Sequence, residues 1–89
     1  MNRKIKLKDY RAGMLVVSTD RVETQVYTVE SIKGYWITMV WREGDRTCIC
    51  GMDSSMLMTP TIEQIEYSIN NNGRLADMND VADVKVVIG

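Results

Sequence analysis

Two closely spaced cysteines are the residues of this 89-residue chain that could most readily do chemistry. On a strand, Cys48, Cys50 and Met52 project to one side, because side chains alternate with a period of two. Their sulfurs would suit Cu(I), whereas a structural zinc site needs four ligands, and the chain has neither His nor a third Cys. Free Cys is among the most buried residue types. We therefore expect two reduced thiols packed in the core, and no metal site.

Nucleophilic catalysis lacks a general base in this chain. Either cysteine, or Ser54 and Ser55, could attack an electrophile, but there is no His to activate them. A chain of this length also rarely encloses the pocket of about 300–1,000 Å³ that small-molecule sites occupy. We expect no catalytic residue, no cofactor and no enzymatic activity.

Oxygen-bearing side chains cluster further along the chain, at Asp77, Asn79, Asp80 and Asp83. A calcium loop of the EF-hand type would need a ligand, a glycine and a glutamate at positions where the chain has Val81, Ala82 and Ile88. We therefore expect a solvated segment whose side chains cap helices and form turns.

A basic arm opens the sequence, and nucleic acid is the partner that it suggests. Residues 1–11 carry five basic side chains and one acidic one, although the whole chain has eleven basic and twelve acidic residues. Phosphate contacts provide most non-specific affinity for nucleic acid, and a net charge of −1 offers few of them. The alternative is a solvated edge strand, whose lysines discourage edge-to-edge pairing. The basic side chains are Arg3, Lys4, Lys6, Lys8 and Arg11.

Short apolar, β-branched runs predict strands over most of residues 5–58. The clearest are 14–19, 25–32, 35–42 and 46–50. Lys33-Gly34 and Glu43-Gly44-Asp45 predict two tight hairpin turns, because glycine adopts a positive φ without steric cost. Strands joined by turns this short form an antiparallel meander.

The pattern then changes to that of a helix over about 60–72. Thr59 would be its N-cap and Pro60 its first residue, and Ile62, Ile65 and Ile69 would form one apolar stripe. Gly73 suits the C-terminal end. A further helical turn is allowed by the spacing of Leu75, Met78 and Val81, and the β-branched run 84–88 predicts a final strand.

The segment Lys8–Pro60 resembles the SH3-like small barrels. Asp9–Met14 would lead into the first strand, Tyr27–Gly34 and Tyr35–Trp41 would be the next two, and Ser55–Leu57 would be the short turn that closes such barrels. The resemblance implies a small antiparallel barrel. With the helix and final strand that the later pattern predicts, and the single domain over residues 1–89 that the length predicts, we expect a mainly β (α+β) fold with one C-terminal helix and a final strand. It also points to small proteins of bacteria, phages or mobile elements.

The resemblance does not extend to receptors for Pro-rich peptides. Those receptors place acidic residues beside an aromatic groove. Here the first loop carries only Asp20 and Glu23 as acidic residues.

The prediction of function is based on the aromatic strand 35–42. It is apolar on both faces, so we expect the helix to cover one face and a partner to cover the other. The alternative is that the helix and the final strand complete the cover and leave no exposed patch. Which face is buried stays open at this point. An exposed Trp beside Arg is typical of an interaction hot spot. We expect a binding site for a protein, either another protein or a second copy, at Tyr35, Trp36, Val40, Arg42 and Arg46.

The setting is expected to be the cytoplasm, without a membrane or a small-molecule substrate as partner. No apolar run approaches the roughly 20 residues that span a bilayer. No apolar segment follows the basic start, so we expect no secretory signal.

Overall fold

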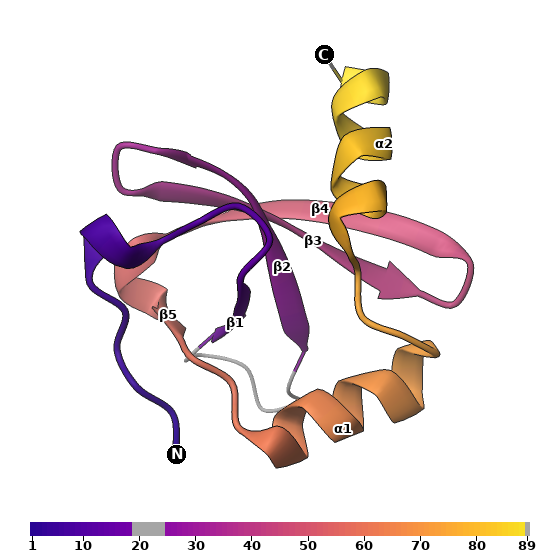
Figure 1. Cartoon of the computed structure of the whole chain (residues 1–89), viewed down its shortest axis with the longest axis horizontal. Coiled ribbons are helices and arrows are strands. Elements are labelled where there is room, and N and C mark those ends of the chain that lie inside the picture. The colour runs from indigo at the N-terminus through magenta and orange to yellow at the C-terminus, as the bar shows by residue number, and fades with distance from the viewer. Residues whose placement is uncertain (19–24, 89) are drawn as a thin grey trace.

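The computed structural model describes residues 1–18 and 25–88 and shows a mainly β domain. Two helices, α1 (Ile62–Asn72) and α2 (Met78–Ile88), follow the strands (Figure 1), and short 3-10 turns, η1 (Leu7–Asp9) and η2 (Ser54–Met56), precede β1 and β5. Asp20 and Glu23, the acidic residues of the first loop, lie outside the described residues. The strands are β1 (Leu15–Ser18), β2 (Val26–Lys33), β3 (Trp36–Glu43), β4 (Arg46–Asp53) and β5 (Leu57–Met58).

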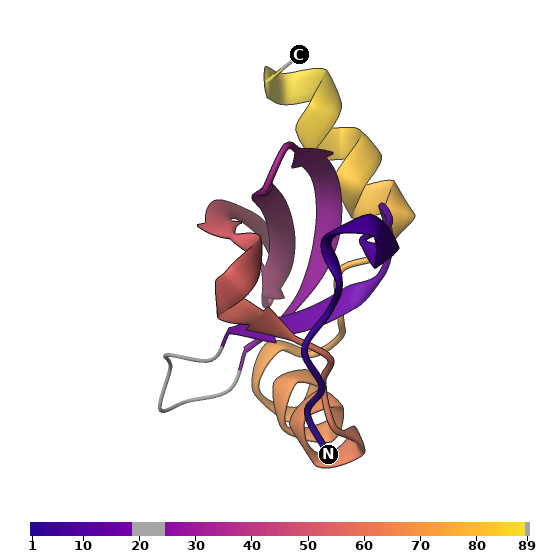
Figure 2. The same cartoon turned by 90° about the vertical axis from the view of Figure 1, so that its left-hand side faces the viewer.

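The strands form one antiparallel sheet in the order β4-β3-β2-β1-β5. The predicted meander is confirmed in β2, β3 and β4. Its turns contain Gly34 and Gly44, both with a φ of +63°. The sheet bends strongly (Figures 1 and 2) but is not closed, because β4 and β5 are its two edges and do not pair with each other in the described part of the chain.

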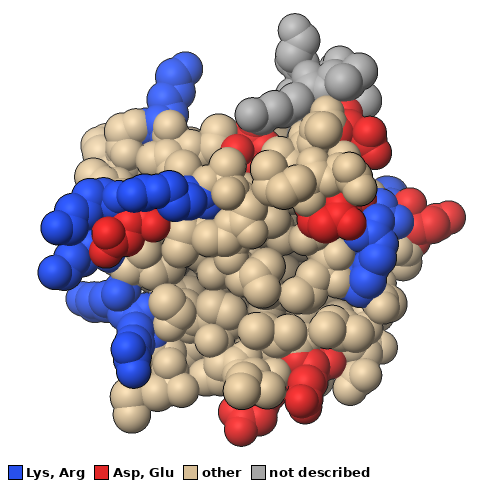
Figure 3. Space-filling model, viewed as in Figure 1, with Lys and Arg blue, Asp and Glu red and all other residues tan. Residues whose placement is uncertain are grey.

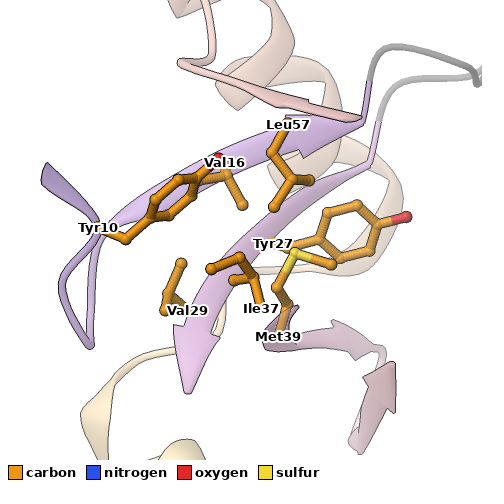
Figure 4. Close-up of a cluster of buried hydrophobic side chains, with 7 residues drawn as sticks. All are labelled: Tyr10, Val16, Tyr27, Val29, Ile37, Met39 and Leu57. Atoms are coloured by element: carbon orange, nitrogen blue, oxygen red, sulfur yellow. The ribbon is translucent and has the colours of Figure 1, made fainter. Parts of the chain in front are cut away.

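The inner, concave face of the sheet holds the larger core. Tyr27 and Trp41 meet edge to face there, with ring centroids 5.3 Å apart. The Tyr10 hydroxyl donates to the Ser54 carbonyl over 2.7 Å, which ties the segment before β1 to η2. The cluster is drawn in Figure 4 and consists of Tyr10, Val16, Tyr27, Val29, Ile37, Met39 and Leu57.

The outer face of β3 is covered by the C-terminal part of the chain. Val40 packs with Ala76 and Val81 and is 0% exposed, and the Thr28 hydroxyl donates to the Ala76 carbonyl over 2.7 Å. The prediction that Val40 belongs to a binding surface is therefore wrong. Both faces of β3 find apolar cover within the chain, because α2 packs where a partner was expected.

Helix α1 begins two residues later than predicted. Thr61, not Thr59, is its N-cap, because Thr61 and Gln64 form a reciprocal capping box. The predicted isoleucine stripe does not face the sheet as a whole: Ile62 is 74% exposed, and the buried residue of α1 is Ser68. Its hydroxyl accepts a hydrogen bond from the Val26 N–H, so a small polar side chain makes the closest approach to β2.

The predicted final strand 84–88 is also wrong, because those residues continue helix α2. The Asp77 carboxylate accepts from the backbone N–H groups of Asn79 and Asp80, and the Asp80 carboxylate accepts from the Asp77 N–H over 2.8 Å. This reciprocal cap starts a helix, and the modest helix propensity of valine does not stop it once it has started. The expectation that the acidic cluster caps a helix is confirmed for Asp77 and Asp80, but the expectation that the cluster is solvated is wrong for Asp80, which is buried.

Asp80 fixes α2 to the sheet through two arginines. Its buried carboxylate accepts from both Arg74 nitrogens, at 2.7 and 2.9 Å, and lies 3.4 Å from Arg42 Nη1 on β3. The hydrogen bonds from Arg74 hold the pKa of Asp80 well below its usual range, against the opposing effect of burial, with further lowering from the Asp77 N–H and Arg42. The carboxylate is thus ionised in the folded chain, and its partners compensate the cost of burial.

We expect Asp80→Asn to lower the free energy of unfolding by about 3 kcal/mol near neutral pH, because two arginines lose their buried counter-charge. A carboxyl with a depressed pKa stabilises the fold above its unfolded pKa of about 4 and loses that contribution as the pH falls. The difference between wild type and variant should therefore shrink below about pH 4. Urea unfolding across this range measures it. Asp83→Asn, on an exposed residue of the same helix, is the control, and an equal loss there would contradict the role of Asp80.

Candidate interaction surface

The half-exposed side chain of Trp36 packs against the backbone of β4. Trp36 opens β3 opposite Asp53, on the same face of the hairpin as Thr38 and Gly51, and its side chain is 49% exposed. A Cβ built on Gly51 would lie 2.8 Å from Cε2 of the indole. The indole therefore lies against the bare Gly51 backbone, with its other side open to solvent.

Ile49 extends this exposed apolar area along β4. It lies two residues from Gly51 on the same face, opposite Val40, and is 41% exposed because α2 covers Val40 without covering Ile49. We call Trp36, Thr38, Ile49 and Gly51 the hairpin surface. Sequence reasoning missed Ile49 and Gly51, although a glycine flanked by apolar residues opposite an aromatic strand was a usable signal.

The two predicted arginines differ in their availability. Arg42 has a side chain only 13% exposed, and its guanidinium donates to the Thr47 hydroxyl and the Gly44 carbonyl and pairs with Asp80. Arg42 thus holds the structure together. Arg46 is 74% exposed, and its ion pair with Glu43 at 3.3 Å is a surface pair that contributes little to stability. Of the two, Arg46 is the one that a partner could contact.

Tyr35 lies in the β2–β3 turn and is exposed. Its carbonyl accepts from the Ser54 N–H over 2.8 Å, so the turn is fastened to the start of η2 while the ring stays open to solvent. Of the five predicted binding residues, the structure therefore leaves Tyr35, Trp36 and Arg46 accessible and assigns Val40 and Arg42 to internal packing.

The two cysteines lie on the opposite face of β4 from the hairpin surface. Cys48 pairs with Trp41 and Cys50 with Met39, and Cys50 packs against the inner core. Neither forms a disulfide and both are half-buried, with Cys50 against the core and Cys48 nearer the end of the strand. Across residues 1–18 and 25–88, no three His, Cys, Asp or Glu side chains come close enough together to hold a metal ion.

The basic arm lies along the opposite edge of the sheet, beside β5. Lys4 bridges to Met58, and the Arg3 backbone exchanges hydrogen bonds with Thr59. Figure 3 shows basic side chains gathered at one end of this face, whereas the other end mixes both signs. The β3–β4 turn, next to Arg46, lies at that other end (Figure 1), so the fold does not join the arm to Arg46.

Comparison with known proteins adds no relative: no family model matches the chain, and neither a curated protein nor a solved structure shows detectable similarity to it. Among the helices in the described part of the chain, none is both long enough and apolar enough to cross a bilayer.

We expect Gly51→Val to displace the Trp36 indole, because the valine side chain would occupy the space of the ring. Valine itself normally favours a strand. The indole emission should shift to the red, and the free energy of unfolding should fall by about 1 kcal/mol or more. Fluorescence and urea unfolding measure both. A Trp36→Phe variant emits from Trp41 alone. Adding Gly51→Val to that variant should leave its emission unchanged. An unchanged emission spectrum in Gly51→Val would show that the Trp36 indole does not pack against Gly51.

Proposed function

We propose that this chain is a small, non-enzymatic protein-interaction domain that binds through the hairpin surface, with Trp36 as the anchor. The observation that carries the proposal is a half-exposed indole that packs against a glycine of the edge strand β4. A Trp held in place before binding loses little conformational freedom when a partner covers it, and Trp, Tyr and Arg are enriched among residues that dominate binding energy. Ile49 supplies the apolar surround and Tyr35 lies next to Trp36 in the chain, whereas Arg46 lies at the other end of the hairpin, where it could make a separate polar contact.

We infer that the domain is built like an SH3-like small barrel that stays open between β4 and β5. The support is the short turn η2 immediately before β5, the pairing of β5 with β1, and the β2–β3–β4 meander. A cytoplasmic location, and an origin in a bacterium, phage or mobile element, belong to the same proposal. Two cysteines on one strand that form no disulfide support the reducing compartment.

Nucleic acid is the second candidate partner, and the gathering of basic side chains at one end of the face in Figure 3 favours it. Stacking on Tyr35 or Trp36 would accompany phosphate contacts from the arm. Binding of this kind falls steeply with salt, because counterions are released from the phosphates. Light scattering of the chain with added DNA or RNA, at low and moderate salt, tests it. The Lys4, Lys6 and Lys8 triple Ala variant should then lose the complex, and a wild-type mass that stays constant would exclude this candidate.

We expect Trp36→Ala to abolish capture of protein partners, with affinity reduced by about 30-fold or more, because the variant removes the anchor of the surface. The immobilised chain and its variants are incubated with a bacterial lysate, and retained proteins are quantified. Tyr67→Ala, which truncates an exposed aromatic residue on α1, is the matched control and should retain the same proteins. Circular dichroism establishes that both variants fold. A folded Trp36→Ala variant that captures every protein seen with wild type would overturn the proposal.

A further inference from the structure

Strand β4 leaves one side of its backbone open. Tyr35 and Ser54 share a backbone hydrogen bond, so by alternation Met52, Cys50, Cys48 and Arg46 exchange their hydrogen bonds with β3. The backbone N–H and C=O groups of the intervening residues therefore point away from the sheet. In the described part of the chain no strand pairs with this edge. The open groups belong to Thr47, Ile49, Gly51 and Asp53.

This edge lacks the features that prevent strand pairing. Charged side chains, proline, bulges and short length are the usual protections of an edge strand. The strand β4 has eight residues, an uninterrupted register with β3, and no charge or proline between Arg46 and Asp53. The other edge is different, because β5 has two residues and Lys4 is bridged to it.

We propose that β4 is a docking edge for a second copy of this chain, which adds its own β4 antiparallel to form one continuous sheet across a two-fold axis. The inference rests on the proposed function, because it names a partner for the same hairpin. A two-fold contact brings the same strand from both copies together. The identity of the strand therefore fixes which residues face each other once the register is known.

Backbone geometry and charge select the register. Only residues whose open groups face each other can exchange hydrogen bonds, so the axis must pass through a residue. An axis at Ile49 or Cys50 pairs seven residues of β4 in each copy, whereas an axis at Cys48 or Gly51 pairs only five. An axis at Ile49 would place Asp45 opposite Asp53 of the second copy, which is repulsive. An axis at Gly51 would place the two Gly51 residues side by side, so the two Trp36 indoles that pack on them would compete for the same space. The axis at Cys50 avoids both problems and opposes no like charges.

The register centred on Cys50 also covers the hairpin surface. It places Ile49 of each copy opposite Gly51 of the other, against the indole of Trp36 that lies on that glycine. The two half-exposed apolar side chains of the surface, at 41% and 49%, would thus cover each other across the axis. Filling the space above a strand glycine with a neighbouring apolar side chain stabilises sheets.

Helix α2 provides cover above the added strand. It packs on β4 at its start, where Asp80 lies 3.5 Å from the Thr47 hydroxyl. Figures 1 and 2 show that its last turns then extend beyond the rest of the chain, and in Figure 1 they pass β4. A strand added to β4 would lie beside these turns, so the helix would bridge both copies.

The position of Cys50 makes the register directly testable. On the axis, the two Cys50 residues face each other as a pair without mutual backbone hydrogen bonds, about 4.5 Å apart at Cα, within the range of a disulfide. Cys48 instead faces Met52 of the second copy. Diamide takes two electrons and two protons from the two thiols and becomes a hydrazine, leaving the S–S bond. We expect Cys48→Ser to form a cross-linked dimer with diamide and Cys50→Ser to remain uncross-linked.

The full chain is measured by light scattering behind a sizing column over a wide concentration range, and a mass of twice 10.2 kDa is expected at the upper end. Ile49→Lys should raise the dissociation constant at least about tenfold, because it places two lysines beside the axis. Ile62→Lys, on an exposed residue of α1 away from this edge, should leave the dimer intact. Circular dichroism establishes folding of both variants.

A chain that stays monomeric at every concentration overturns the second copy as partner. A dimer that Ile49→Lys leaves intact overturns the β4 edge, and a dimer that cross-links through Cys48 overturns the register centred on Cys50. In either case the capture experiment with Trp36→Ala still decides the proposed function independently. Both proposals fail only when one of these outcomes occurs and, in addition, the Trp36→Ala variant captures every partner.

Discussion

The ion pairs around Asp80 are the interaction on which the rest of the fold depends. Strand β3 is apolar on both faces, and a chain of 89 residues cannot build two large cores. The inner face is filled by aromatic and branched side chains from several elements, whereas the outer face is covered mainly by one short helix. Three apolar residues, Val40, Ala76 and Val81, are a small contact area for holding a helix. Arg42 and Arg74 add the charge-assisted hydrogen bonds that fix where α2 begins on the sheet.

This way of covering β3 also determines what remains exposed. Helix α2 reaches Val40 and Arg42 in the middle and at the far end of β3, so those residues serve the interior. It leaves the start of β3 uncovered, where Trp36 lies on Gly51, and it leaves Ile49 half-open on β4. The apolar area that a partner could use is therefore the part of the outer face that α2 does not cover. Its position follows from the place at which Asp80 anchors the helix.

Local signals in the sequence were sufficient for the hairpins but not for the helix that packs across them. Gly34 and Gly44 mark their turns because a positive φ favours glycine, and that requirement is independent of tertiary context. The start of α1 depended on which of two threonines could cap it: Thr61 has Gln64 at the spacing of a capping box, and Thr59 has no such partner. The helical state of residues 84–88 depended on the Asp77–Asp80 cap, which outweighed the strand preference of the valines. The burial of Val40 and Arg42 could not be predicted, because it depends on a contact with residues about forty positions away. Ile49 and Gly51 gained meaning only once the register placed them beside Trp36.

The two edges of the sheet differ in length and in their protection by charged residues, and this difference is the reason to expect assembly through β4. The β5 edge is short and lies against a basic segment, which is how soluble proteins usually keep edges apart. The β4 edge is four times longer, regular and uncharged over its central residues. General pressure against aggregation would protect both edges, so it does not account for the difference. A specific use of β4 does account for it, and the placement of Trp36, Gly51 and Ile49 on one face of that strand gives such a contact its side-chain selectivity.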